Sequence, residues 1–330
     1  MSVIVVGAGI AGVSCARTLA AAGVPVRVLD RGRRPGGRLG LRRLTVDGGE
    51  RVVDTGGSYF TVSDDGFGAV AEDWRARGLA RPWTDTFAVI DDDGEQTKQG
   101  PTRWAAPSGL RSLVDDLAAG LDVSSSVTVT AVEHGDDGWT VRTETRTDDG
   151  RSTGDAGPAD VVVLAMPDPQ ARRLLADGPE REAFGLEFEP VLALTAAWPE
   201  RSWPDRDGVF VNGDDVLAWV ADDGLRRGDR APVLVAHSTP DFARPRLEDP
   251  AAAAGPMAER LVDRLGLAGP PASTHVQRWS FARPATPRDE PYLLTPSGLA
   301  ACGDGWAAKP SVEAAFVSGR RLAEAALARG

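Results

Sequence analysis

Ser2-Val3-Ile4-Val5-Val6-Gly7-Ala8-Gly9-Ile10-Ala11-Gly12 stands at the start of the chain, and Val24-Pro25-Val26-Arg27-Val28-Leu29-Asp30 follows it closely. The apolar residues of both stretches predict short strands, and the small residues between them predict a helix. A strand, a tight glycine turn, a helix and a second strand that ends in an acidic residue are typical of a βαβ unit that binds a dinucleotide.

Each glycine of this turn has a physical reason. Gly7 permits the sharp turn, Gly9 lets the backbone approach a pyrophosphate, and Gly12 lets the helix pack against the strand. The helix N-terminus offers free N–H groups and a positive dipole end to the phosphates, and Asp30 can accept hydrogen bonds from a ribose. A tight turn in another α/β fold is the alternative, and the motif does not distinguish FAD from a nicotinamide.

Composition restricts the class of protein. A chain of 330 residues is longer than one typical core, so we expect two domains. The net charge of −11 argues against non-specific binding to nucleic acid or to an anionic membrane. Cys15 and Cys302 are the only cysteines, and no apolar run approaches the roughly 20 residues that span a bilayer. We therefore expect a soluble cytoplasmic protein, of unknown oligomeric state.

Two further stretches carry paired glycines. Arg31-Gly32-Arg33-Arg34-Pro35-Gly36-Gly37-Arg38-Leu39 could be a solvated arginine loop, or a second phosphate contact through the glycine pair and Arg38. Val52-Val53-Asp54-Thr55-Gly56-Gly57-Ser58-Tyr59-Phe60-Thr61 reads as a strand that runs into two glycines and two aromatic residues. Glycines at a strand end indicate either a bulge or a flat ligand against the backbone.

The rest of the chain alternates between helical and strand patterns. Helices are predicted at 67–77, 108–121, 170–175, 251–265 and 312–328. Strands are predicted at 84–99 (a hairpin), 127–132, 139–145, 161–165, 191–197, 216–221, 233–237, 275–281 and 298–302, with a polar loop at 147–158. From 191 onward, strands joined by Pro- and Asp-rich turns indicate an antiparallel sheet with a covering helix, and hence a second domain.

The C-terminal segment has the same order of elements as the start of the chain: a strand, a glycine turn and a helix. A strand ends at Cys302, Gly303-Asp304 forms a turn, and a helix follows from Val312. Gly303 would let the backbone pass close to a ligand, Asp304 could bind a polyol chain, and the helix N-terminus at Ser311-Val312 would direct its positive end at an acceptor. An ordinary closing βα unit is the alternative.

Taken together, these segments resemble a flavoprotein of the flavin amine oxidase superfamily, and most closely its renalase-like branch. The resemblance rests on six stretches in order along the chain. They are Val6-Gly7-Ala8-Gly9-Ile10-Ala11-Gly12, Pro35-Gly36-Gly37-Arg38, residues 53–61, residues 161–167 with Gln170, Gln277-Arg278-Trp279-Ser280-Phe281-Ala282, and Cys302-Gly303-Asp304 with residues 313–319.

The resemblance implies an α/β fold with a Rossmann-like FAD-binding domain of the glutathione-reductase-like type and a second, α+β substrate domain built on an antiparallel sheet. We expect residues 1–65, 100–190 and 285–330 in the FAD-binding domain and residues 66–99 and 191–284 in the substrate domain. It also implies non-covalent FAD and no metal. The implied cofactor-binding residues are Gly7, Ala8, Gly9, Ile10, Ala11, Gly12, Asp30, Arg31, Gly37, Arg38, Leu39, Gly56, Gly57, Ser58, Tyr59, Val129, Gly303, Asp304, Ser311 and Val312.

The implied roles follow the motifs. The first glycine turn and Arg38 would hold the pyrophosphate, Asp30 the adenosine ribose, and the backbone of Val129 the adenine. Residues 56–59 would run along the flavin ring. Asp304 would bind the ribityl or phosphate region, and the backbone of Val312 would lie near flavin N1 and O2, where a helix N-terminus stabilises the negative charge of reduced flavin.

Two departures from the family concern the substrate. Classical amine oxidases place a lysine near flavin N5 from the substrate domain, but this chain has no lysine between Lys98 and Lys309. The renalase-like pattern usually has histidine where Gln277 stands, and glutamine hydrogen-bonds but does not titrate. Cys302 is expected to be a small buried residue rather than a covalent flavin anchor.

Four residues are candidates for the reacting site: Tyr59, Gln277, Trp279 and His237. Tyr59 and Trp279 could contact the faces of a flat substrate, or they could simply pack in the protein core. His237 lies on a predicted strand and could have a structural role. We expect an FAD-dependent oxidoreductase that transfers a hydride from a small organic donor, dihydronicotinamide-like or an amine, to flavin N5, with reoxidation by molecular oxygen. The alternatives are a flavin-binding protein without turnover and an NAD-dependent dehydrogenase.

Overall fold

The computed structural model describes residues 1–46, 49–147, 150–286 and 288–329, and it divides into two compact units. The first unit comprises residues 1–37, 114–188 and 283–330, and the second comprises residues 38–113 and 189–282. Residues 38–65 and 100–113, which we expected in the FAD-binding domain, pack with the second unit instead. The functional assignment of the two domains stays a prediction.

A six-stranded sheet forms the centre of the first unit. In spatial order its strands are β17 (Leu293–Leu294), β18 (Leu299–Ala301), β11 (Val161–Leu164), β1 (Val3–Val6), β2 (Val26–Asp30) and β7 (Asp122–Ser125). All pairs are parallel except β17 with β18. Every residue of β1 is buried, because β1 lies between β2 and β11 and has both faces covered. That burial explains its unbroken apolar sequence.

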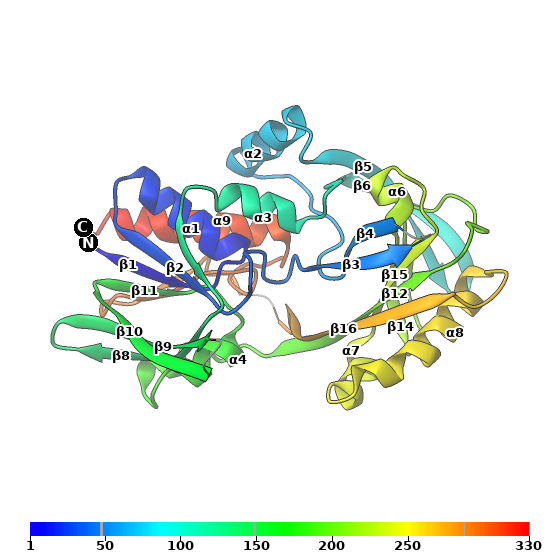
Figure 1. The fold of residues 1–330 in the computed structure, drawn as a ribbon. Helices are drawn as coiled ribbons and strands as arrows, with labels where there is room; N and C mark the ends of the chain where they lie inside the picture. The colour runs from blue at the N-terminus through cyan, green and yellow to red at the C-terminus, as the bar shows by residue number, and fades with distance from the viewer. Residues whose placement is uncertain (47–48, 148–149, 287, 330) are drawn as a thin grey trace. The chain divides into compact units, whose positions relative to one another are not determined.

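Helices α1 (Ile10–Ala21) and α9 (Val312–Leu327) lie side by side in this unit (Figure 1). A Cβ on Gly319 would collide with the carbonyl oxygen of Ala11, so the two helix backbones touch. The hydroxyl of Ser14 donates to the carbonyl of Phe316 at 2.9 Å. The predicted terminal helix is confirmed, and its glycine is what allows this close approach.

A three-stranded antiparallel sheet also packs on the core of the first unit. Its strands are β8 (Val127–Gly135), β9 (Gly138–Thr147) and β10 (Gly150–Ala159). Val132, Trp139 and Val141 join Ile4 and Leu164 in one buried cluster. The prediction of a polar loop at 147–158 is wrong for its described residues, because the polar side chains lie on a strand whose backbone pairs with β9. Short helices α4 (Asp168–Ala171), η1 (Arg172–Leu174) and α5 (Pro179–Glu182) follow β11.

A seven-stranded sheet forms the second unit. In spatial order its strands are β16 (Ser273–Pro284), β12 (Phe188–Ala197), β15 (Val233–Ser238), β14 (Leu217–Asp222), β13 (Gly208–Val211), β5 (Arg81–Asp91) and β6 (Gly94–Ala105). The expected antiparallel sheet needs one correction, because β13 pairs parallel to β5. Strand β13 was not predicted, since four residues between turns carry little periodicity.

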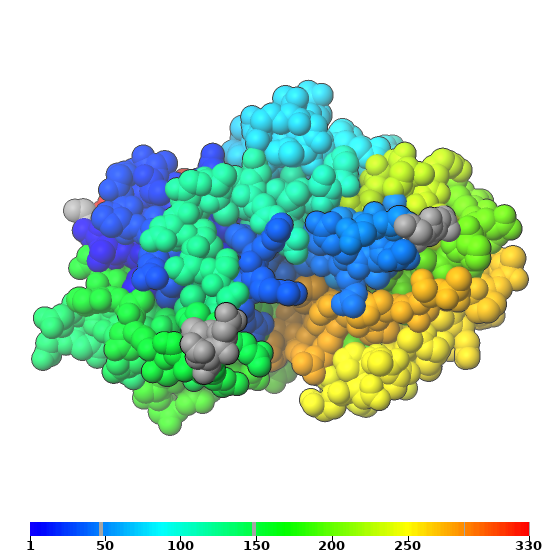
Figure 2. Space-filling view, in the orientation of Figure 1, coloured from blue at the N-terminus to red at the C-terminus, as the bar shows by residue number. Residues whose placement is uncertain are grey.

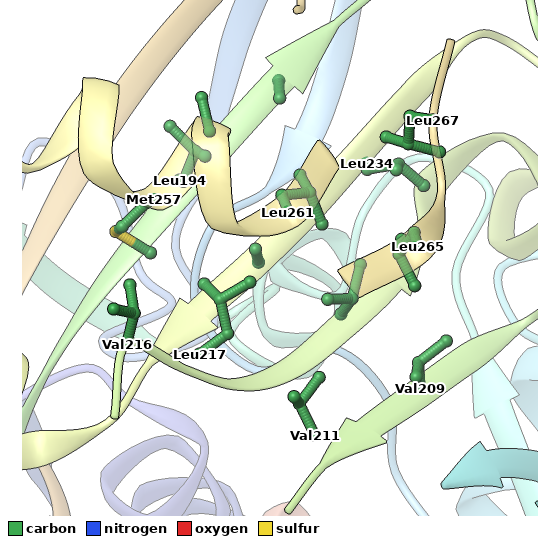
Figure 3. Packing of buried hydrophobic residues seen from close by; sticks show 14 of the residues in the cluster. Leu194, Val209, Val211, Val216, Leu217, Leu234, Met257, Leu261, Leu265 and Leu267 are labelled. Carbon is green, nitrogen blue, oxygen red and sulfur yellow. The ribbon is translucent and has the colours of Figure 1, made fainter. Parts of the chain in front are cut away.

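One face of this sheet, which we call the helix face, packs against α8 (Ala254–Leu265). Figure 3 shows Met257, Leu261 and Leu265 of this helix packed in one cluster with Leu194 and Leu234 of the sheet. The outward sides of α8 and β16 lie next to each other on the surface (Figure 2). The helix face is therefore filled by its own core.

The opposite face, which we call the hairpin face, packs against the hairpin of β3 (Leu41–Val46) and β4 (Gly49–Asp54). Val53 of the hairpin joins Ala197, Val233 and Val235 in a small buried cluster. Side chains alternate along a strand, so residues two apart from these lie on the same face. This alternation determines which candidate residues of the sheet lie on the hairpin face and which lie on the helix face.

Shorter helices complete the second unit. They are α2 (Asp65–Ala76), α6 (Asp223–Arg227), α7 (Pro240–Ala243), η2 (Arg244–Arg246) and η3 (Pro250–Ala253). Helix α3 (Arg111–Leu117) is shorter than the predicted helix at 108–121, because a turn at Gly109 with φ +88° precedes it. Within the described ranges, no helix is both long and apolar enough to cross a membrane.

Candidate functional site

The glycine turn between β1 and α1 is shaped by backbone packing. Gly7 has φ +112°, and a Cβ there would lie 2.5 Å from the carbonyl oxygen of Ala165. A Cβ on Gly12 would overlap the carbonyl oxygen of Gly7 and lie 2.9 Å from the Cβ of Ala165. Since backbone atoms cannot move aside, only glycine fits at either position.

The N-terminus of α1 has no side-chain cap. Its N-cap residue, Gly9, is extended, and no side chain in the described part of the chain caps the helix. By contrast, side chains cap four other helices, α2, α6, α7 and α9: Asp64, Asp222, Thr239 and Ser311. A helix N-terminus without a side-chain cap and without an acidic residue in its first turn suits a phosphate.

The following basic loop folds back onto this turn. The N–H of Gly36 donates to the carbonyl of Ala8 at 2.8 Å, and Gly37, with φ +54°, passes Gly9 so closely that a Cβ on Gly37 would lie 3.2 Å from the Gly9 Cα. The side chain of Arg31 is exposed. The region around Gly9 is thus built from residues without Cβ atoms, which fits the approach of a pyrophosphate.

Asp30 holds this turn together. One carboxylate oxygen accepts from the N–H of Ala8 and the other from the N–H of Gly32, both at 2.6 Å. Each oxygen keeps a further lone pair, so a contact with a ribose is compatible with this geometry. Sequence reasoning missed this backbone role, although an acid two residues before a glycine is a turn signal.

The C-terminal candidates also lie in the first unit. Gly303 has φ +153°, no described atom lies within 4 Å of a Cβ placed on it, and its N–H donates to the hydroxyl of Ser318 at 3.0 Å. Asp304 follows Gly303 directly. The hydroxyl of Ser311 accepts from the N–H of Ala314 at 3.0 Å, so Ser311 caps α9. Val312 is the first residue of the helix.

Val129 is a half-buried residue of β8 that packs against the core of this unit.

In the second unit, the segment 54–59, which contains the candidates 56–59, begins at the last residue of β4. A Cβ on Gly56 would overlap the carbonyl oxygen of Arg38, and the N–H of Gly57 donates to that same oxygen at 3.0 Å. The guanidinium of Arg38 donates to the carbonyl of Ala282 at 3.0 Å. Leu39, the residue after Arg38, is buried. Backbone contact again explains the glycine.

Tyr59 belongs to an aromatic cluster on the hairpin face. Its ring centroid lies 5.3 Å from that of Phe87, 5.8 Å from Trp219 and 6.4 Å from Trp83. Arg103 lies 4.2 Å above the Phe87 ring. Burial raises the pKa of Tyr59, and the charge of Arg103 offsets part of this rise. Sequence reasoning missed Phe87, Trp83 and Arg103, because only the strand pairing brings them to Tyr59.

The sheet register places the other catalytic candidates on the hairpin face. His237 pairs with Ala193 on one side and with Trp219 on the other, which puts His237 beside the ring that contacts Tyr59. Gln277 and Trp279 are two apart on β16, and the indole N–H of Trp279 donates to the carbonyl of Thr55 at 2.6 Å. The amide of Gln277 donates to the carbonyl of Arg278 at 3.0 Å.

A buried ion cluster lies behind the segment 54–59 and was not predicted. Arg227 pairs with Asp54 at 2.9 Å, and Arg51, Arg226 and Arg227 all pair with Asp223. Burial raises the pKa of Asp54, and the two guanidinium groups of Arg226 and Arg227 only partly counteract it. Burial would also raise the pKa of Asp223, but the charges of Arg226, Arg227 and Arg51 hold it below its ordinary value.

The cysteines and the acidic residues give no sign of a metal centre. Cys15 and Cys302 are both buried and free. A hydrogen bond with Cys15, and then burial, raise the pKa of the Cys302 thiol well above its ordinary value. Among the described residues, no three His, Cys, Asp or Glu side chains are grouped as metal ligands.

Comparisons with known proteins match this geometry. Residues 5–75 match an NAD(P)-binding Rossmann-like domain, and residues 66–327 match the flavin containing amine oxidoreductase family. A lysine-specific histone demethylase 1 homolog from Arabidopsis thaliana is 48% identical over 61 residues, which are 18% of this chain and 7% of that relative. The chain therefore spans only a small part of that curated relative.

Solved structures share the fold over the whole chain. A proposed protoporphyrinogen oxidase from Exiguobacterium sp. 255-15 has a TM-score of 0.76 at 14% identity, covering 100% of this chain and 99% of the other. A triple mutant of putrescine oxidase has a TM-score of 0.74 at 17% identity, with coverage of 100% and 99%. Cyclohexylamine oxidase from Brevibacterium oxydans IH-35A has a TM-score of 0.73 at 14% identity, with coverage of 99% of each chain.

The predicted fold class is confirmed, and a flavin enzyme is favoured over a flavin-binding protein without turnover and over an NAD-dependent dehydrogenase. The family match covers more than half of the chain. The chain belongs to the flavin-containing amine oxidoreductase family and is an FAD-dependent oxidoreductase.

Proposed function

We propose that this oxidoreductase oxidises a small organic donor, an amine or a dihydronicotinamide-like molecule, and passes the electrons to molecular oxygen, as the renalase-like branch implies. The observation that carries the proposal is the gathering of His237 and Trp219 with Tyr59 on the hairpin face, and of Gln277 and Trp279 on the same face. Flat aromatic side chains beside polar groups suit a small planar donor.

The proposed cofactor contacts follow the motifs that carry the family resemblance. Gly7, Gly9 and Gly12 would hold the pyrophosphate at the open end of α1, with Asp30 at the adenosine ribose and Val129 at the adenine. Asp304 would bind the ribityl or phosphate region and Val312 the N1 side of the ring. Arg38 would contribute to the pyrophosphate, and Gly56, Gly57, Ser58 and Tyr59 would run along the ring.

Bound FAD supplies the acceptor for two electrons and a proton. We propose that it is held without a covalent bond, because Cys302 is fully buried and its raised pKa keeps the thiol protonated and unreactive. The protein's own contribution is orientation. Trp279 and Tyr59 would fix the plane of the donor, Gln277 would accept or donate one hydrogen bond, and His237 would add an imidazole hydrogen-bonding group beside Trp219.

The direct test is anaerobic reduction of the purified holoenzyme. We expect addition of NADH, NADPH or a panel of primary amines to bleach the flavin absorbance near about 450 nm, and we expect air to restore it with formation of hydrogen peroxide. Gln277→Ala should slow the bleaching, and Gln96→Ala, an exposed change on β6, should not. Full FAD occupancy without bleaching by either class of donor would overturn the proposed donors, and recovery without peroxide would overturn oxygen as the acceptor.

A further inference from the structure

We propose that Arg226 is a positioning residue for the flavin ring: it holds and polarises the peptide between Ser58 and Tyr59, and its buried pairing with Asp223 fixes it there. The inference rests on the proposed function only in assigning segment 56–59 to the flavin. It requires no particular donor.

Arg226 is deeply buried for an arginine. Its side chain is 1% exposed, one guanidinium nitrogen donates to the carbonyl of Ser58 at 3.0 Å, and another pairs with Asp223. The carboxylate of Asp54 lies 3.9 Å from the same guanidinium. Burying a cation costs several kcal/mol unless carboxylates surround it, so the two aspartates are what permit a charge at this position.

The location of Arg226 is fixed by its short helix. Helix α6 begins at the end of β14, where the carboxylate of Asp222 caps it by accepting from the N–H of Leu225 at 2.9 Å. Arg226 and its neighbour Arg227 then reach two different points of the same segment, the carbonyl of Ser58 and the carboxylate of Asp54. One helical turn therefore anchors both ends of the stretch that contains Gly56 and Gly57.

The neighbouring N–H groups point to a ligand. The N–H of Gly57 donates to Arg38 and the N–H of Phe60 donates to Trp104, at 3.0 and 3.1 Å. Between them, the backbone N–H groups of Ser58 and Tyr59 have no acceptor in residues 1–46, 49–147, 150–286 and 288–329. Ser58 is buried and Tyr59 half-buried, and backbone N–H groups at such positions are nearly always paired with protein, water or a ligand. These two N–H groups are therefore available to donate to a bound group.

The chemistry of the peptide links these observations. The carbonyl of Ser58 and the N–H of Tyr59 belong to one peptide group, so a cation on the carbonyl withdraws electron density and makes the N–H a stronger donor. A carbonyl oxygen or ring nitrogen of the flavin is an acceptor of the required kind. A stronger hydrogen bond to the ring favours its reduced, more negative form and raises its potential. A neutral donor at Ser58 would hold the backbone without this effect.

The test compares Arg226→Met, Arg226→Lys and the control Arg230→Met in the FAD-loaded enzyme. Arg230 lies three residues after α6 and pairs with Asp205 at the surface. For Arg226→Met we expect FAD to dissociate about tenfold more readily and the two-electron midpoint potential to fall by about 30 mV, the equivalent of a tenfold change. The control should match the wild type, and Arg226→Lys, which keeps the charge, should recover part of the potential.

All of these readouts are taken without a donor, so they are independent of whether the proposed substrates are correct. If Arg226→Met does not fold, Arg226→Lys alone tests the proposal. In the folded Arg226→Lys variant we then expect a shifted flavin spectrum and a midpoint potential below that of the wild type. A wild-type potential, spectrum and FAD affinity in the folded variants would overturn the proposal and leave Arg226 a merely structural residue.

Discussion

The glycine turn at residues 7–12 and the segment at residues 54–59 are both assigned to the same cofactor, yet they are built differently. The turn is shaped almost entirely by main-chain contacts, with one carboxylate, Asp30, closing it. The segment is held by side chains that come from far along the chain, Arg226, Arg227 and Trp279. The turn should therefore fail when a backbone contact is blocked, and the segment when a charge or hydrogen bond is removed.

Gly12→Ala should produce the largest effect. The added Cβ would overlap the carbonyl oxygen of Gly7 and press on Ala165, and neither group can move without displacing β1 or β11. We expect a loss of about 5 kcal/mol or more in the free energy of unfolding, together with loss of bound FAD. Urea unfolding and the flavin absorbance of the purified protein measure both.

The matched control is Gly255→Ala in α8, where a Cβ would meet no described atom within 4 Å. Alanine is the better helix former by up to about 1 kcal/mol, so this variant should be neutral or slightly stabilised. If Gly12→Ala behaved like Gly255→Ala, backbone packing would not be what shapes the turn.

Asp223→Asn should be the largest single disruption of the second region. It leaves the guanidinium groups of Arg51, Arg226 and Arg227 without their shared buried carboxylate, and breaking such a cluster costs about 3–5 kcal/mol. The pKa of Asp223 is lowered in the folded protein, so its stabilisation is fully present above about pH 3.9, the value in an unfolded chain. It is lost as the pH falls through the lower folded value.

The stability difference between wild type and Asp223→Asn should therefore be constant from pH 5 to 7 and shrink below about pH 4. Urea midpoints across this range measure it. A difference that grows toward acid pH would contradict the lowered pKa of Asp223.

Asp30→Asn disrupts the carboxylate contacts that close the glycine turn at residues 7–12. An amide can replace only one of the two acceptors, so one backbone N–H of Ala8 or Gly32 loses its partner, at about 1.5–3 kcal/mol. FAD binding should weaken as well, which titration of the apoprotein would show. Asp160→Asn is the control, because Asp160 makes a similar 2.6 Å contact with the N–H of Ser2 at an exposed site. Equal effects of the two changes would contradict a special role for Asp30.

This difference between the regions also decides what the sequence reveals. The turn, α1, β2 and Asp30 lie within 30 residues, and each follows from local spacing of glycines and apolar residues, so their prediction needed no tertiary information. The same holds for α9, whose apolar stripe and Ser311 cap are local signals. These are the parts for which a sequence pattern has a direct physical cause.

The second region depends on contacts between residues 168 to 224 positions apart. Nothing in the sequence around Asp223-Gly224-Leu225-Arg226-Arg227 separates it from a solvated charged turn, since its burial depends on contacts with Arg51, Asp54 and Ser58, far away in the sequence. Strands β10 and β13 were not predicted for the same reason, because neighbouring strands determine their pairing. The residues of β10 are mostly polar or small, and β13 has only four residues. Candidate residues on β16 could be named from the family pattern, but their common face required the sheet register.

Trp279→Phe should give the smallest of these effects and the sharpest comparison. It keeps the aromatic ring but removes the indole N–H that donates to the carbonyl of Thr55 at 2.6 Å, at a cost of about 1 kcal/mol in stability. Trp198→Phe removes a similar indole contact, 2.9 Å to the carbonyl of Gly269, from a site on the other face of the same sheet. Both variants should therefore lose similar stability, but only Trp279→Phe should shift the flavin absorption spectrum, because only Thr55 adjoins Gly56 and Gly57. An unchanged spectrum in Trp279→Phe would mean that the side chains around segment 54–59 stabilise the fold without setting the position of the cofactor.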